Sequence, residues 1–130
     1  MGAWGTGPFG NDDAADLLGA LRRMTAPERA WRIRAVLMLG PGYLQVSGAD
    51  AAVAAAALVA AARGWPADAS RGAAELVRTG TIPADGQVRE RARVALSRVA
   101  GGDSEWRELW DEAGELAEVA GILDSIQAYL

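Results

Sequence analysis

The chain has 130 residues, of which 51% are hydrophobic, and a formal net charge of −4. It contains neither Cys nor His, which excludes disulfides, thiolate or imidazole metal sites, and catalysis by a Cys nucleophile or a His base. The surplus of acidic residues argues against a nucleic-acid or anionic-membrane partner, because phosphate groups are bound chiefly by surplus positive charge.

A chain of this length forms one domain with its own core, and no repeat, low-complexity linker or domain boundary is visible in it. Much of the hydrophobic content is Ala, so we expect the five Trp to supply much of the core volume. They are Trp4, Trp31, Trp65, Trp106 and Trp110. No secretory signal is recognisable, and the apolar segment 51–62 is shorter than the roughly 20 residues that span a bilayer. We therefore expect a cytoplasmic protein.

The first segment of the chain is rich in Gly and holds Trp4 and Phe9. Glycines allow tight turns, so we expect this loop to dock on the fold through its two aromatic side chains. The sequence Asn11-Asp12-Asp13-Ala14-Ala15-Asp16 follows. Asn11 or Asp12 is expected to cap a first helix over about 12–23.

Apolar residues at helical spacing, preceded by capping residues and followed by Gly or Pro, predict the remaining helices. The second helix begins near Pro27 with Thr25 as its cap, and the third runs from Ser47 or Asp50 to Arg63. The fourth covers about 69–79 and the fifth about 85–99. The sixth begins at Asp103 or Ser104, and the helical pattern continues after Gly114 to Leu130. The connector 43–46 is expected to be extended without a partner strand. The prediction is an all-α bundle of five to seven helices.

The alanine-rich helix that ends at Arg63 is expected at the centre of this bundle. Ala combines high helix propensity with a small side chain, so neighbouring helices approach closely on every side. The alternative is that its small residues pack a homodimer.

The order Met-Gly-Ala-Trp-Gly-x-Gly-Pro-Phe at 1–9 and Asn-Asp-Asp-Ala-Ala-Asp at 11–16 resembles the bacterial domain-of-unknown-function family 4259. The alanine-rich segment 51–64 and the acidic segment 104–112, with a Trp after Leu, agree with it. Such sequences often carry a further Trp where this chain reads Gly-Glu-Leu-Ala-Glu-Val at 114–119. The resemblance implies a helical fold and an unassigned function, and it transfers no catalytic residue.

The sharpest candidate for chemistry is the set Asp12, Asp13 and Asp16. On a helix Asp12 and Asp16 share a face with Asp13 beside them, so their oxygens would suit a hard divalent cation. The alternative is an acidic helix start that complements the positive end of the helix dipole. No other cofactor is expected, because the glycine loop lacks both a preceding strand and a Walker Lys.

Charge is unevenly distributed near the C-terminus, with Arg concentrated in 89–98 and acidic residues in 103–118. One interpretation is that the two segments pair with each other and with solvent. The other is an acidic surface for a basic protein partner. The candidate partner surface comprises Trp4, Phe9, Glu105, Glu108, Asp111 and Glu112. Trp106 and Trp110, one helical turn apart, are expected in the core and not as a stacking platform.

These patterns favour a non-enzymatic, cytoplasmic interaction domain of regulatory or immunity type, monomeric or homodimeric, without a nucleic-acid or membrane partner. The alternative is a carboxylate-based domain that binds a divalent metal or a small ligand at Asp12, Asp13 and Asp16.

Overall fold

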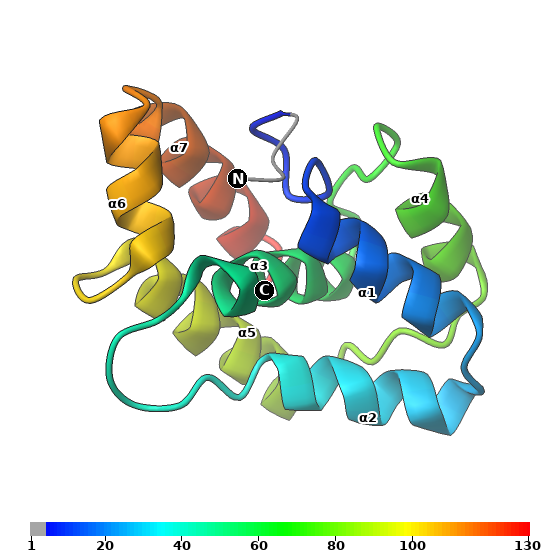
Figure 1. The fold of residues 1–130 in the computed structure, drawn as a ribbon. Coiled ribbons are helices and arrows are strands. Elements are labelled where there is room, and N and C mark those ends of the chain that lie inside the picture. The colour runs from blue at the N-terminus through cyan, green and yellow to red at the C-terminus, as the bar shows by residue number, and fades with distance from the viewer. Residues whose placement is uncertain (1–4) are drawn as a thin grey trace.

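The computed structural model describes residues 5–130, which fold into seven α-helices. The helices are α1 (Asp12–Arg22), α2 (Ala26–Val36), α3 (Val46–Ala61), α4 (Arg71–Arg78), α5 (Gly86–Ala100), α6 (Glu105–Glu112) and α7 (Leu116–Gln127). Figure 1 shows α3 in the middle of the molecule, with α1 and α4 toward one end and α6 and α7 toward the other. The predicted all-α bundle is confirmed. No helix among residues 5–130 is both long and apolar enough to cross a membrane.

The alanine-rich helix α3 is the core of the fold, as predicted. It packs against every other helix, and each residue from Ala52 to Ala61 is buried. Small side chains allow this close approach from all directions. From Ala52 to Ala61 the helix is covered on all sides within one chain, so this stretch is not available to pack a homodimer.

Three helix starts follow the predicted caps. The Oδ1 atom of Asn11 accepts a hydrogen bond from the amide of Ala14 at 2.8 Å. Thr25 forms a capping box with Glu28, and Ser104 caps α6. These side chains satisfy amides that have no partner within their own helix.

Helix α3 begins differently from the prediction, and the expected caps Ser47 and Asp50 are both wrong. Its N-cap is Gln45, whose side chain makes no capping hydrogen bond. The amide of Val46 donates instead to Oε1 of Glu105 at 2.7 Å. A residue distant in sequence thus takes the place of a local cap, and Asp50 lies inside the helix.

The connector before α3 also has a partner that the sequence did not reveal. Leu44 pairs with Ser104 in an isolated parallel bridge. The amide of Leu44 donates to the carbonyl of Asp103, and the amide of Glu105 donates to the carbonyl of Leu44, both at 2.8 Å. This bridge fastens the start of α3 to the start of α6.

The Trp residues divide between core and surface. Trp106 and Trp110 are 4% and 8% exposed, with ring centroids 6.5 Å apart in an edge-on arrangement, which confirms their core position. Trp31 is 69% exposed, so the expectation that it fills the core is wrong. Trp65 is half-buried, and Trp4 lies outside the described residues.

Candidate functional site

The N-terminal loop 5–10 lies between α7 and α4 (Figure 1) and is docked at two points. The hydroxyl of Thr6 donates to Glu118 of α7 at 3.2 Å. Phe9 is half-buried, and its ring centroid lies 6.4 Å from that of Trp65. The loop therefore bridges two sides of the bundle and borders a hollow on each.

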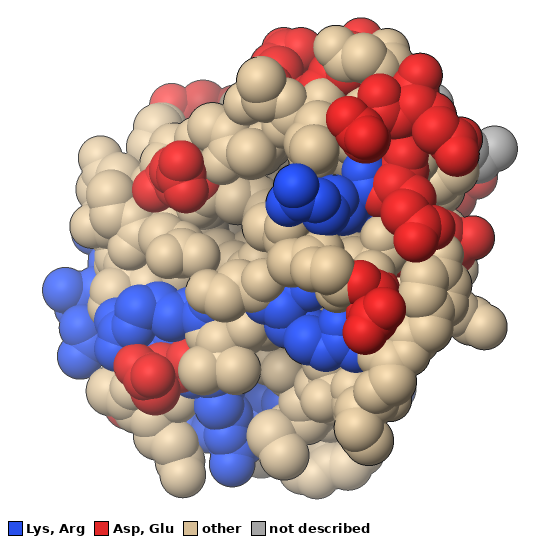
Figure 2. Space-filling view, turned by 90° about the vertical axis from the view of Figure 1, so that its left-hand side faces the viewer, with Lys and Arg blue, Asp and Glu red and all other residues tan. Residues whose placement is uncertain are grey.

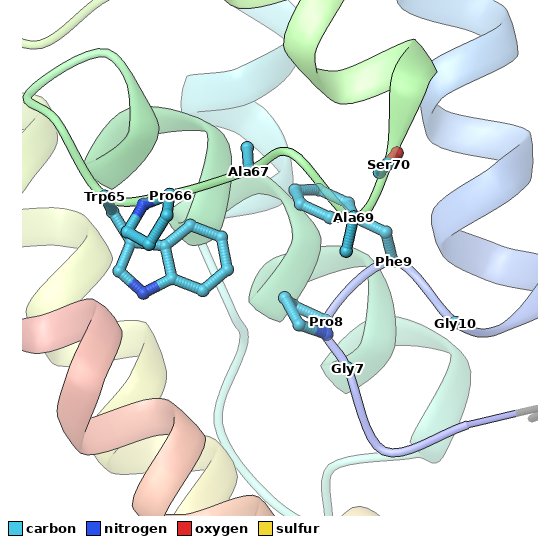
Figure 3. Close-up of a pocket in the computed structure, with 9 residues that line it drawn as sticks. All are labelled: Gly7, Pro8, Phe9, Gly10, Trp65, Pro66, Ala67, Ala69 and Ser70. Atoms are coloured by element: carbon cyan, nitrogen blue, oxygen red, sulfur yellow. The ribbon is translucent and has the colours of Figure 1, made fainter.

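The first hollow, of about 270 Å³, lies between the loop and the segment after α3. Figure 3 shows Phe9 and Trp65 on opposite sides of it, with Pro8 at its edge. Its polar side chains are already engaged, since Nε1 of Trp65 donates to Ser125 and Oγ of Ser70 accepts from the amide of Ala73. This hollow offers apolar contact and no reactive group.

The second hollow is a narrow crevice between the loop, α3 and the α6–α7 pair, with a volume of about 10 Å³. Asp50 lines it together with Asn11 and the two core Trp. Asp50 is 9% exposed and its side chain makes no hydrogen bond within residues 5–130. Burial, together with the smaller effect of the negative charge of Asp13, raises the pKa of Asp50 from 3.8 to about 7.

Asp50 is not among the site residues predicted from the sequence, because its position before an apolar segment indicated a helix cap. The signal that would have identified it is an isolated acidic residue at the start of an otherwise apolar, alanine-rich helix. Such a residue is buried as soon as the helix becomes the core. Acidic side chains are almost never fully buried unless they are paired.

The predicted metal ligands do not gather into one site. Asp12 and Asp16 are exposed, and Asp13 is half-buried. Among residues 5–130 no group of three or more Asp, Glu, His or Cys side chains is placed to hold a metal ion. The negative charge of Asp13 instead raises the pKa of Asp50. The metal hypothesis for this set stays a prediction without support from the geometry.

The acidic residues of α6 and the start of α7 divide into two groups. Glu105 is half-buried and binds the amide of Val46. Glu108 is exposed and accepts a hydrogen bond from the hydroxyl of Tyr43 at 2.7 Å, which raises the pKa of Tyr43 to about 12. The other exposed acidic side chains are Asp111, Glu112, Glu115 and Glu118.

We call the exposed set Glu108, Asp111, Glu112, Glu115 and Glu118 the acidic face. Figure 2 looks onto the α6 side of the molecule and shows acidic side chains gathered toward its upper right, with basic side chains across its lower half. The predicted partner residues thus do not form one patch. Phe9 belongs to the apolar hollow, and Glu105 serves as a cap. Glu108, Asp111 and Glu112 belong to the acidic face, and Trp4 lies outside the described residues.

The interpretation that the Arg-rich and acidic segments pair with each other is wrong. Within residues 5–130 the salt bridges are Arg34 with Asp85 at 2.6 Å and Arg93 with Glu90 at 2.7 Å. The guanidinium of Arg107 binds the carbonyl of Ala100 at 2.6 Å, and that of Arg98 binds backbone carbonyls. The negative charge of the acidic face is therefore not neutralised by these cations.

Residues 2–121 match a sequence family described as a domain of unknown function (DUF4259). The chain belongs to this family. The matched region covers α1 to α6 and the first half of α7. The N-terminal loop, Asp50 and the acidic face therefore lie within the DUF4259 domain. No curated protein and no solved structure is significantly similar to the chain.

Proposed function

We propose that this DUF4259 protein is a non-enzymatic, cytoplasmic interaction domain of regulatory or immunity type. Its partner is a basic protein, and the binding surface is the acidic face on α6 and the start of α7. The proposal rests on one observation, which is that the acidic face carries five exposed carboxylates and none of them forms an ion pair within residues 5–130.

The position of these carboxylates makes them suited to binding. Like charges crowded on two short helices repel one another, and a cationic partner relieves this repulsion. Charge complementarity also raises the association rate and makes it sensitive to salt. A stabilising role within the fold does not account for this face. Of its five carboxylates, Glu108 accepts a hydrogen bond from Tyr43 and Glu118 accepts one from Thr6. The other three have no hydrogen-bond partner on another helix or loop within residues 5–130.

The absence of Cys and His from the sequence supports a binding role over a catalytic one. The larger hollow between Phe9 and Trp65 agrees with this, since the polar side chains around it are already hydrogen-bonded. An apolar hollow of this kind accommodates a side chain of a partner more readily than it performs chemistry.

The experiment is affinity capture from lysate of the source organism, with the wild-type protein and with a variant that carries Asp111→Asn, Glu112→Gln and Glu115→Gln. We expect one basic protein to be captured by the wild type, to be lost as salt is raised, and to be lost with the variant. The measured quantity is the amount of that protein bound at each salt concentration.

The matched control removes the same charge elsewhere, through Asp16→Asn, Asp68→Asn and Glu75→Gln, all of which are exposed in the structure. The control should capture as much of the basic protein as the wild type. Equal loss in both variants would reduce the effect to net charge and overturn the assignment to the acidic face. Capture that is unaffected by salt would also contradict it.

A further inference from the structure

The buried carboxylate of Asp50 is the feature of the structure that most needs an explanation. It is 9% exposed, and no side chain or backbone group of residues 5–130 donates a hydrogen bond to it. Taking an ionised carboxylate out of water without a partner is strongly unfavourable. Proteins keep such a group only where something compensates it or where it has a use.

Among residues 5–130 the surroundings of Asp50 add negative charge and contribute no basic side chain. The negative charge of Asp13 on α1 raises the pKa of Asp50. None of the described residues that line the crevice is basic. At the loop side Thr6 lines the crevice and binds Glu118, which brings the acidic face up to its edge. The charges around the crevice therefore favour a cation.

Two aromatic side chains stand among the mostly aliphatic walls of the crevice. Trp106 and Trp110 line it, and their rings stand edge-on to each other. The face of an indole ring attracts a cation by its quadrupole, most strongly where water is excluded. A carboxylate beside two indoles is the combination that binds ammonium groups.

The size of the crevice selects among cations. Its volume of about 10 Å³ is near the minimum that holds one water molecule. A primary ammonium group is of that size, whereas the planar guanidinium of Arg is larger. A divalent metal needs more oxygen ligands than Asp50 and Asp13 provide, and no group of three acidic side chains is available among residues 5–130.

We propose that the crevice lined by Asp50, Trp106 and Trp110 receives one primary ammonium group, supplied by a Lys side chain of the basic partner. The inference rests on the proposed function and deepens it. The acidic face attracts the partner, and the crevice beside it binds a single Lys, whose methylene stem leaves along Gly7 and Pro8 of the loop.

The test uses small probes and needs no knowledge of the partner. Butylammonium chloride and Nα-acetyl-lysine N-methylamide are titrated into labelled protein at pH 8.5, where Asp50 is ionised, and the indole N–H resonances of Trp106 and Trp110 are followed by NMR. We expect saturable shifts with dissociation constants in the millimolar range. 1-Butanol, which has the same chain without the charge, should leave these resonances in place.

The variant Asp50→Asn keeps the shape of the side chain and removes its charge. We expect it to lose at least ten-fold in affinity for both amines. The matched control Asp124→Asn, at an exposed position of α7, should bind as the wild type does. The circular dichroism spectrum of each variant establishes that it is folded. Equal binding by Asp50→Asn and the wild type would overturn the proposal.

The remaining outcomes separate this inference from the proposed function. If the indole resonances shift with butylammonium but not with Nα-acetyl-lysine N-methylamide, the crevice binds a free small amine. That outcome would overturn its assignment to a Lys side chain of the partner. No saturable shift with either amine, together with salt-sensitive capture through the acidic face, would overturn the crevice proposal and leave the proposed function standing. Equal affinity for Nα-acetyl-arginine N-methylamide would contradict the argument from size.

Discussion

Glu105, the first residue of α6, accepts a hydrogen bond from the backbone amide of Val46, the first residue of α3, at 2.7 Å. The two residues are 59 positions apart in sequence. Helix α3 has no side-chain cap of its own, so a helix on the acidic side of the molecule completes the start of the central helix. This contact links the acidic segment to the stability of the core.

Replacement of Glu105 by Ala should therefore destabilise the fold. Loss of an N-terminal capping acceptor lowers the free energy of unfolding by about 1 kcal/mol, and we expect that effect in urea denaturation followed by circular dichroism. Glu105→Gln keeps an acceptor oxygen and should retain most of the stability. If Glu105→Ala unfolds at the same urea concentration as the wild type, the cap does not stabilise α3.

The raised pKa of Asp50 predicts that the free energy of unfolding falls as the pH rises from about 4 to about 7. The pKa of Asp50 in the folded chain is raised from 3.8 to about 7. Within that interval the unfolded chain has released this proton while the folded chain retains it, so raising the pH favours unfolding. Below the interval the carboxyl is protonated in both states, and above it the destabilisation is constant.

The variant Asp50→Asn removes this destabilisation. A pKa difference of about three corresponds to about 4 kcal/mol, and solvent screening of this partly buried group reduces it. We therefore expect the free energy of unfolding of the variant to exceed that of the wild type by roughly 2–4 kcal/mol at pH 8 and to be close to it at pH 4. Urea denaturation of both proteins at pH 4, 6 and 8 measures the difference. A difference that stays the same at all three pH values would show that the charge of Asp50 is not its cause.

The two classes of Trp predict opposite responses to truncation. Trp106→Ala removes a side chain that is 4% exposed and should lower the free energy of unfolding by roughly 3–5 kcal/mol. Trp31→Ala removes one that is 69% exposed and should change it by less than about 0.5 kcal/mol. Thermal unfolding of the two variants tests this, and a large loss for Trp31→Ala would indicate that a partner or a second copy covers it.

The acidic start of α1 can be tested with calcium. Asp12 and Asp16 are exposed, and no third ligand group among residues 5–130 joins them. We therefore expect no saturable heat when millimolar calcium is titrated into the protein by calorimetry. A saturable heat that is abolished by the double variant Asp12→Asn, Asp16→Asn would instead establish the metal site.

Asn11→Ala should lower the free energy of unfolding by about 1 kcal/mol, since Asn11 is the residue that caps α1.

Local sequence signals sufficed for most of the helices. The caps Asn11, Thr25 and Ser104 bind amides of their own helices, so the relevant contacts lie within a few residues of one another. The alanine-rich composition of α3 predicted a central helix because small side chains permit close packing on all sides. These features are determined over short stretches of chain, where propensity and hydrogen bonding act directly.

Contacts between distant residues decided the rest. No local pattern indicates that Glu105 caps Val46 or that Leu44 pairs with Ser104. Nor does any local pattern indicate that Arg98 of α5 binds backbone carbonyls and not acidic side chains. Each of these contacts depends on how the helices pack. The same holds for the candidate sites. The sequence by itself determined the acidic segment and its charge. Only the tertiary structure placed Asp50 beside two indoles and left it without a counter-ion within residues 5–130. The reason is that burial is a property of the packed chain and not of the single residue.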